Sequence, residues 1–130
     1  GVRNVWVENL QAQSVDRGIY IKSNRDRGGF VENIYVRDVK MGKARYALRV
    51  VTDYKGYRGG NHSPRFNNLV FENIDCSEAE QALHVAGSAD APIGSMTVRG
   101  LRCARTEQTP VIAAAPALRI EDVVLNGEML

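Results

Sequence analysis

The sequence of 130 residues lacks several features that mark whole classes of protein. No apolar run approaches the roughly 18 residues of a membrane span, and the N-terminal stretch shows no basic segment followed by an apolar one. These residues therefore read as neither a signal peptide nor a membrane segment, and we expect no membrane partner. The 2 cysteines have no zinc-like spacing and are too few for a disulfide-rich scaffold.

Histidines and cysteines give no pattern of metal ligands either. His62 lies in a stretch with a loop composition, and His84 takes an outward position in an apolar strand. Neither has a second His or Cys at ligand spacing, so we expect no metal site and no cofactor. Cys76 and Cys103 hold the same position in consecutive repeats, where directly stacked strands seldom give good disulfide geometry, so we expect buried free thiols.

What is present fits one folded domain, because 44% of the residues are apolar and 25% are charged. The net charge of +2 hides an asymmetry between the two halves. Residues 1–65 carry 13 basic and 6 acidic side chains, a balance of +7, whereas residues 66–130 carry 4 and 9, a balance of −5. A basic half attracts a polyanion, which charge alone leaves open as nucleic acid, an anionic polysaccharide or an acidic partner.

Internal self-similarity is the strongest signal in the sequence. Five segments share the same order of apolar, outward and corner positions. They are Asn4–Leu10, Asn33–Val39, Asn68–Ile74, Ser95–Leu101 and Ala117–Val123. The copies follow one another at spacings of 29, 35, 27 and 22 residues, which indicates structural coils joined by loops of variable length.

Within each copy, the first two apolar positions alternate with an outward one, as in a strand with one buried face. The alternation then slips at a residue type that tolerates left-handed backbone geometry, which predicts a corner between two short strands. The predicted corner residues are Asn9, Asp38, Asn73, Gly100 and Asp122. An antiparallel sandwich of look-alike strands is the alternative, but hairpin signals are scarce, and Asn126-Gly127 follows the last copy.

A second strand is predicted after each of the first four copies, at 18–22, 47–51, 82–86 and 111–114. Stacking equivalent strands about 4.8 Å apart builds one interior ladder. Its predicted members are Val7, Val36, Phe71, Val98 and Ile120. The sequence thus predicts an all-β, right-handed parallel β-helix of about four to five coils. We treat residues 1–130 as one partial β-helix domain and, because the repeat is already present at Gly1, we expect earlier coils to precede it.

One polar loop allows a more specific comparison. The run from Gly18 to Gly29, GIYIKSNRDRGG, resembles a segment of polygalacturonase-type, pectin-degrading glycoside hydrolases that carries an Arg-Ile-Lys motif and then a Gly-Gly turn. The following stretch to Met41 is similar in character to that family's next coil. The resemblance implies a pectin-lyase-like β-helix, the C-terminal part of a longer enzyme that hydrolyses galacturonan by inversion, and a secreted or periplasmic location.

By this resemblance, four residues are expected to contact an anionic polysaccharide substrate. Lys22 matches the family's lysine, and Tyr54 is the nearest candidate for an aromatic residue of the following coil. Tyr20 stands where the family has arginine and cannot form the bidentate pair with a carboxylate that arginine forms. Asn24, in the loop after Lys22, completes the predicted substrate-binding set.

No residue is assigned a catalytic role. Inverting hydrolysis needs one carboxylic acid to protonate the leaving oxygen and one carboxylate to activate water. The resemblance implies that an Asn-x-Asp element and an Asp-Asp pair, supported by a Gly-His-Gly turn, supply them before the Arg-Ile-Lys position. The chain has no Asp-Asp pair and no histidine flanked by glycines, and Asp16 and Asp26 are single acids beside arginines. We therefore expect a fragment of a polygalacturonase-like hydrolase that is inactive alone.

Other functions stay open on the residues alone. A non-catalytic β-solenoid that binds carbohydrate or serves in assembly has the same repeat. Trp6 and Tyr35 share an outward position and offer either a sugar-stacking face or a packing surface. Arginines and tyrosines such as Arg49 and Tyr57 interleave as on a single-stranded nucleic acid surface, but no nucleic acid motif accompanies them, so we expect no such partner. An open solenoid end at Gly1 predicts self-association.

Overall fold

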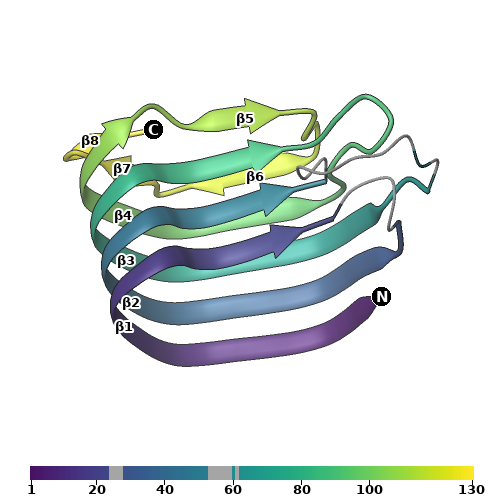
Figure 1. The fold of residues 1–130 in the computed structure, drawn as a ribbon. Coiled ribbons are helices and arrows are strands. Elements are labelled where there is room, and N and C mark those ends of the chain that lie inside the picture. The colour runs from purple at the N-terminus through teal and green to yellow at the C-terminus, as the bar shows by residue number, and fades with distance from the viewer. Residues whose placement is uncertain (24–27, 53–59, 61) are drawn as a thin grey trace.

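The computed structural model describes residues 1–23, 28–52, 60 and 62–130. These residues form strands and loops without any helix, so none of them belongs to a helix that could cross a membrane. The chain winds into a stack of coils that rises from β1 at the N-terminus to the C-terminal elements (Figure 1). The strands are β1 (Val2–Lys22), β2 (Phe30–Val51), β3 (Arg65–Ala86), β4 (Met96–Gln108), β5 (Val111–Ala113), β6 (Leu118–Glu121), β7 (Val124–Leu125) and β8 (Glu128–Met129).

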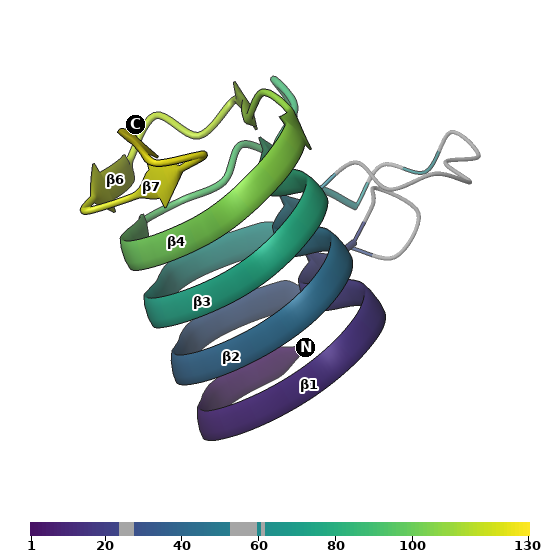
Figure 2. The ribbon, with the colours of Figure 1, turned by 90° about the vertical axis from the view of Figure 1, so that its left-hand side faces the viewer.

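The sheet follows the order β1-β2-β3-β4-β7-β8, with β5 beside β3 and β6 beside β4. These strands pair in parallel except for the β7–β8 hairpin, which confirms the predicted parallel β-helix. Each long strand bends back on itself, so its two halves form opposite walls of one coil (Figure 2). The expectation of two separate short strands per coil is wrong for β1, β2 and β3, which span 21, 22 and 22 residues because ladder pairing continues round the corner.

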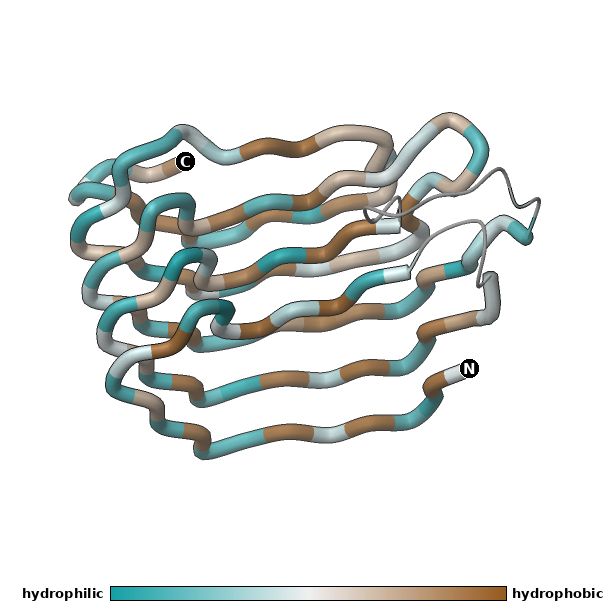
Figure 3. The backbone as a smooth tube through the Cα atoms, viewed as in Figure 1, coloured by the Kyte–Doolittle hydropathy of each residue, from teal (hydrophilic) through white to brown (hydrophobic). Residues whose placement is uncertain are grey.

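The interior ladder predicted from the repeat is present residue for residue. In-register pairs join Val7 to Val36, Val36 to Phe71, Phe71 to Val98, and Val98 to Ile120. Phe71 and Val98 are completely buried, whereas Val7 in the first coil is partly exposed. Figure 3 shows the matching alternation of apolar and polar residues along each coil. The apolar face of each coil is therefore covered by the coils stacked on it.

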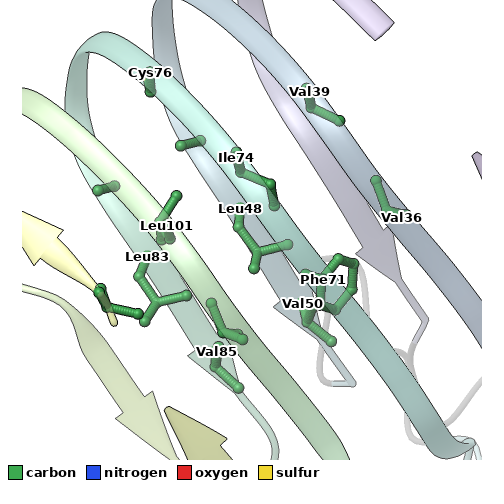
Figure 4. Close-up of a cluster of buried hydrophobic side chains, with 14 of the residues drawn as sticks. Val36, Val39, Leu48, Val50, Phe71, Ile74, Cys76, Leu83, Val85 and Leu101 are labelled. Atoms are coloured by element: carbon green, nitrogen blue, oxygen red, sulfur yellow. The ribbon is translucent and has the colours of Figure 1, made fainter. Parts of the chain in front are cut away.

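The second half of each coil supplies the opposite side of the core. Leu48 and Val50 of β2 pair in register with Leu83 and Val85 of β3, and all four side chains are completely buried. Figure 4 shows them in one cluster with Phe71 of the facing wall. The side chains that alternate with these buried residues therefore point away from the core, onto an outer face of the stack.

Cys76 and Cys103 pair in register within the same core, and both thiols are buried and free, as expected from the sequence. A hydrogen bond with the Cys103 side chain, together with burial, raises the pKa of the Cys76 thiol well above its ordinary value. Cys76 therefore stays protonated at neutral pH and packs as a small apolar side chain.

The predicted corners adopt left-handed backbone geometry. The φ angles at Asn9, Asp38, Asn73, Gly100 and Asp122 are 57°, 57°, 54°, 75° and 52°. Asn, Asp and Gly are the residues that adopt this geometry at least cost, which explains why the corner position is restricted to them. The corner turns the chain from one short wall to the next without breaking the ladder between coils.

A second set of left-handed corners was not predicted from the sequence. Asn4, Asn33 and Asn68, the residues that open the first three repeat copies, have φ angles of 59°, 57° and 56°. Asn33 Nδ2 donates to Asn4 Oδ1 at 3.0 Å, and Asn68 Nδ2 donates to Asn33 Oδ1 at 2.8 Å. The recurrence of asparagine at this one position was the signal for both the geometry and the hydrogen-bonded ladder.

Charged side chains on the outer face after these corners alternate in sign up the stack. One in-register column consists of Glu8, Arg37, Glu72, Arg99 and Glu121. Arg37 lies 3.8 Å from Glu8, and Arg99 lies 3.8 Å from Glu72 and 2.7 Å from Glu121. Such exposed pairs are individually weak, but they neutralise this face. The excess positive charge of residues 1–65 is therefore carried by other surfaces.

The two ends of the stack differ. After the last repeat copy the chain folds back as the β7–β8 hairpin, whose turn residues Asn126 and Gly127 have φ angles of 53° and 77°, as a two-residue hairpin requires. At the opposite end, β1 has β2 as its neighbour in the sheet order, and Trp6 and Leu10 are 58% and 46% exposed. Within the described residues, β1 is thus an edge strand.

Candidate functional site

A group of basic and aromatic side chains covers the outer face of the arrow-headed halves of β1, β2 and β3 in Figure 1. Parallel pairing places these side chains in adjacent columns, since Arg17 is in register with Tyr46, and Tyr20 with Arg49 and then His84. We name this group the basic aromatic cluster. It consists of Arg17, Tyr20, Lys22, Tyr46, Arg49 and His84.

The ring of Tyr20 lies at the centre of the cluster, with three cations around it. The guanidinium carbon of Arg17 is 4.8 Å from the ring centre, and that of Arg49 is 5.1 Å from it. Lys22 Nζ lies 5.5 Å from the same centre. Distances of this size give cation–π attraction, which holds the positive charges close together on one face.

Two of these cations keep unused hydrogen-bonding capacity. The Nε atoms of Arg17 and Arg49 are buried and have no hydrogen-bond partner among the described residues. Arg17 has a loose contact with Asp16, whose carboxylate lies 3.9 Å away and is 69% exposed. A buried donor without a partner carries a desolvation penalty that an incoming acceptor removes. The geometry therefore favours a ligand with negatively charged oxygens.

His84 lies against the same side chains but does not add a charge at neutral pH. Its Nδ1 is 3.0 Å from Gln81 Oε1, and its ring meets that of Tyr46 edge-on with centres 5.7 Å apart. Burial, followed by the nearby charge of Arg49, lowers the pKa of His84 below its ordinary value of 6.5. The neutral imidazole therefore packs beside the cations at pH 7 without repelling them.

A sequence profile of "Glycosyl hydrolases family 28" matches residues 1–117, which are nearly the whole chain. The chain belongs to this family. A "Probable polygalacturonase" from Vitis vinifera is 28% identical over 83 residues, which cover 57% of this chain and 17% of that protein. The chain thus spans about one sixth of the length of this curated relative. The family 28 assignment confirms the resemblance and agrees with the observed parallel β-helix.

Of the four predicted substrate-binding residues, the structure brings two together. Tyr20 and Lys22 are neighbours in the basic aromatic cluster. Asn24 and Tyr54 lie outside the described residues, so their role stays a prediction. Arg17 and Tyr46 were not predicted as site residues. Each precedes a predicted second strand, and the alignment of these strands indicates that this position points outward.

Among the described residues, the acidic side chain that matches the spacing of the family's Asn-x-Asp element lies outside the basic aromatic cluster. The Asn-x-Asp spacing occurs at Asn24 and Asp26, which lie outside the described residues, and again at Asn73 and Asp75. Asn73 donates to Asp38, and Asp75 accepts a hydrogen bond from Arg102 Nε at 2.6 Å. The hydrogen bond from Arg102 lowers the pKa of Asp75, so this acid stays ionised and is a poor proton donor. Both residues thus have structural roles.

A groove at the bend of the coils is lined mainly by acidic side chains, in contrast to the basic aromatic cluster. It has a volume of about 370 Å³ and includes the side chains of two bases and four acids. These are Lys43, Arg45, Asp16, Glu78, Glu80 and Glu107. An excess of carboxylates repels a polyanion, so the basic aromatic cluster is the better surface for an acidic polymer.

In the described part of the chain, no group of three His, Cys, Asp or Glu side chains is arranged so that it could hold a metal ion. Trp6 and Tyr35 form a separate aromatic pair in the first halves of β1 and β2, with ring centres 5.4 Å apart and planes at 42°. The Tyr35 hydroxyl accepts a hydrogen bond from Asn68 Nδ2 at 2.9 Å, which ties it to the asparagine ladder. A sugar-stacking role for this pair stays a prediction.

Proposed function

We propose that this chain supplies a substrate-contacting surface of a polygalacturonase-like hydrolase, and that the surface binds an anionic pectic polysaccharide. The observation that carries the proposal is the grouping of Arg17, Lys22 and Arg49 around Tyr20 in a chain of family 28. Guanidinium and ammonium groups bind carboxylates through charge-assisted hydrogen bonds, and each galacturonate unit of such a polymer carries one carboxylate.

The arrangement of the cluster supports a linear polymer as the ligand. Tyr20, Arg49 and His84 belong to three successive coils, and neighbouring strands lie about 4.8 Å apart. The polar groups are therefore repeated along the axis of the stack, like the repeating units of a polysaccharide. Rings and guanidinium planes between them offer flat surfaces to sugar faces, while the charges select an acidic chain.

We further propose that these 130 residues do not hydrolyse the polymer by themselves. Inverting hydrolysis requires two carboxyl groups on opposite sides of the scissile bond, one of them protonated. The acid that the structure records beside the cluster is Asp16, which is largely exposed and lies next to Arg17. A single carboxyl group cannot fill both roles of the pair.

Two measurements test this proposal together. The purified chain is run through native gels that contain polygalacturonate, where binding retards migration, and is separately incubated with the polymer while new reducing ends are counted. We expect retardation that decreases with added salt, without new reducing ends. Release of reducing ends above a no-protein control overturns the claim of inactivity, and unchanged migration overturns the claim of binding.

A non-catalytic β-solenoid that binds carbohydrate is the second candidate, because the absence of a carboxyl pair from the described cluster also fits a binding module. The gene sequence that precedes Gly1 distinguishes the two. Asn-x-Asp, Asp-Asp and Gly-His-Gly elements there support the hydrolase, and a preceding region without them supports the binding module.

A further inference from the structure

Arg49 differs from the arginines that form ion pairs in how its charge is balanced. Arg37 on the same strand lies 3.5 Å from Asp38 and 3.8 Å from Glu8, and Arg102 lies 2.6 Å from Asp75. Among the described residues, Arg49 has no ion pair, and its buried Nε–H has no hydrogen-bond acceptor. Its positive charge is therefore partly removed from water without a compensating anion among the described residues.

The Arg49 guanidinium is held in place by two aromatic rings. Its carbon lies 5.1 Å from the centre of the Tyr20 ring and 4.6 Å from the centre of the Tyr46 ring. Contacts with two rings restrict the rotamers of the side chain before any ligand arrives, so less conformational entropy is lost on binding. A positioned guanidinium with free donors is suited to a planar carboxylate.

We infer that Arg49 is the residue that recognises the carboxylate of an acidic sugar unit, with Tyr20 and Tyr46 as its supports. The inference rests on the proposed function and deepens it, because it names the group that selects acidic over neutral or esterified sugars. Tyr20 cannot form a two-pronged pair with a carboxylate, and the parallel register places Arg49 beside it one coil further along. The carboxylate therefore binds one strand spacing away from the Tyr20 position.

The test compares Arg49→Gln, Arg49→Lys and a matched control, Arg37→Gln, which removes the same charge from the same strand on the neutralised face. Calorimetric titration with a galacturonate oligomer and with its methyl ester gives the dissociation constants. We expect Arg49→Gln to weaken binding of the free acid by about tenfold or more, as for loss of a charge-assisted hydrogen bond, and Arg37→Gln to change it by less than about twofold.

The remaining readouts separate Arg49 from the general charge of the surface. Arg49→Lys keeps the charge but loses the planar fork, so we expect binding between that of the wild type and Arg49→Gln. Both Arg49 variants should lose less affinity for the methyl ester than for the free acid, and circular dichroism spectra that match the wild type show that they are folded. If the wild type binds the acid and Arg49→Gln binds it equally well, the Arg49 inference is wrong while the proposed function stands. If the wild type does not bind the acid, the proposed function itself fails.

Discussion

The side-chain amide of Asn73 donates a 2.7 Å hydrogen bond to Asp38 Oδ1, which joins equivalent corners of two successive coils. Both residues have left-handed backbone geometry, with φ angles of 54° and 57°. This hydrogen bond, followed by the charge of Arg37, lowers the pKa of Asp38 despite some desolvation. The corner thus combines a backbone requirement with a side-chain ladder that runs along the stack.

Replacing Asn73 separates these two contributions. Asn73→Ala forces an unsuitable residue into left-handed geometry and removes the amide, so we expect a loss of about 1 to 2 kcal/mol in the free energy of unfolding. Asn73→Gly loses the amide but accepts the backbone geometry, so its loss should be smaller. Urea unfolding measures both. A larger loss for glycine than for alanine would contradict the backbone part of this account.

The fold was predictable from the sequence where the determinants are local and repeated. The corner at Asn9 and the interior position of Val7 each recur in five copies, so a single alignment gave their geometry and their register. The corner at Asn4 recurs as asparagine in three copies, but neither its backbone geometry nor its side-chain ladder was predicted. The uninterrupted pairing of β1 was missed because nothing local distinguishes a bend from a break.

The candidate site was less predictable, because it depends on which outward residues meet across coils. Arg49 reaches Tyr20 only because the loop between their coils sets a spacing of 29 residues, and Tyr46 joins them from the next column. The resemblance located Lys22 and Tyr20. The other residues that it suggested, Asn24 and Tyr54, come later in the sequence and not from the strand positions stacked beside Tyr20. Contacts between successive coils are set by the strand register, which brings together residues that are far apart in the sequence.

The same valine-to-alanine substitution should cost more stability at a buried position of the interior ladder than at an exposed one. Val98 is completely buried between Phe71 and Ile120, whereas Val7 is partly exposed at the edge coil. We expect Val98→Ala to lower the free energy of unfolding by about 2 kcal/mol, and Val7→Ala by less than about 1 kcal/mol. Chemical denaturation of the two variants provides the comparison. Equal losses would mean that the first coil is as well covered as the fourth.

The depressed pKa of His84 predicts that stability depends on pH. Because the folded protein protonates His84 less readily than the unfolded chain does, the contribution to stability is fully present above 6.5 and is lost as the pH falls through the lower folded value. The groups that face His84 are Arg49 and Tyr46 on β2 and Gln81 on its own strand. We expect this loss to be absent in His84→Gln. Urea midpoints measured between pH 8 and pH 5 provide the test, and parallel curves for the two proteins would count against it.

The edge position of β1 predicts self-association. Among the described residues, no strand pairs with the side of β1 that faces away from β2, and the partly exposed Val5 packs against the core from this edge. We expect the mean mass in sedimentation to rise with protein concentration. Val5→Lys places a charge at this edge and should shift the distribution towards the monomer. A wild type that stays monomeric at every concentration would contradict the prediction.

The central claim is that the basic aromatic cluster is the surface that binds an acidic pectic polymer. Nuclear magnetic resonance of the labelled chain, titrated with a galacturonate oligomer, tests it most directly. The account predicts that the largest shift changes fall on Arg17, Tyr20, Lys22, Arg49 and His84. Changes concentrated at Trp6 and Tyr35, or at the acidic groove around Glu78 and Glu80, would contradict it, as would a spectrum that does not change.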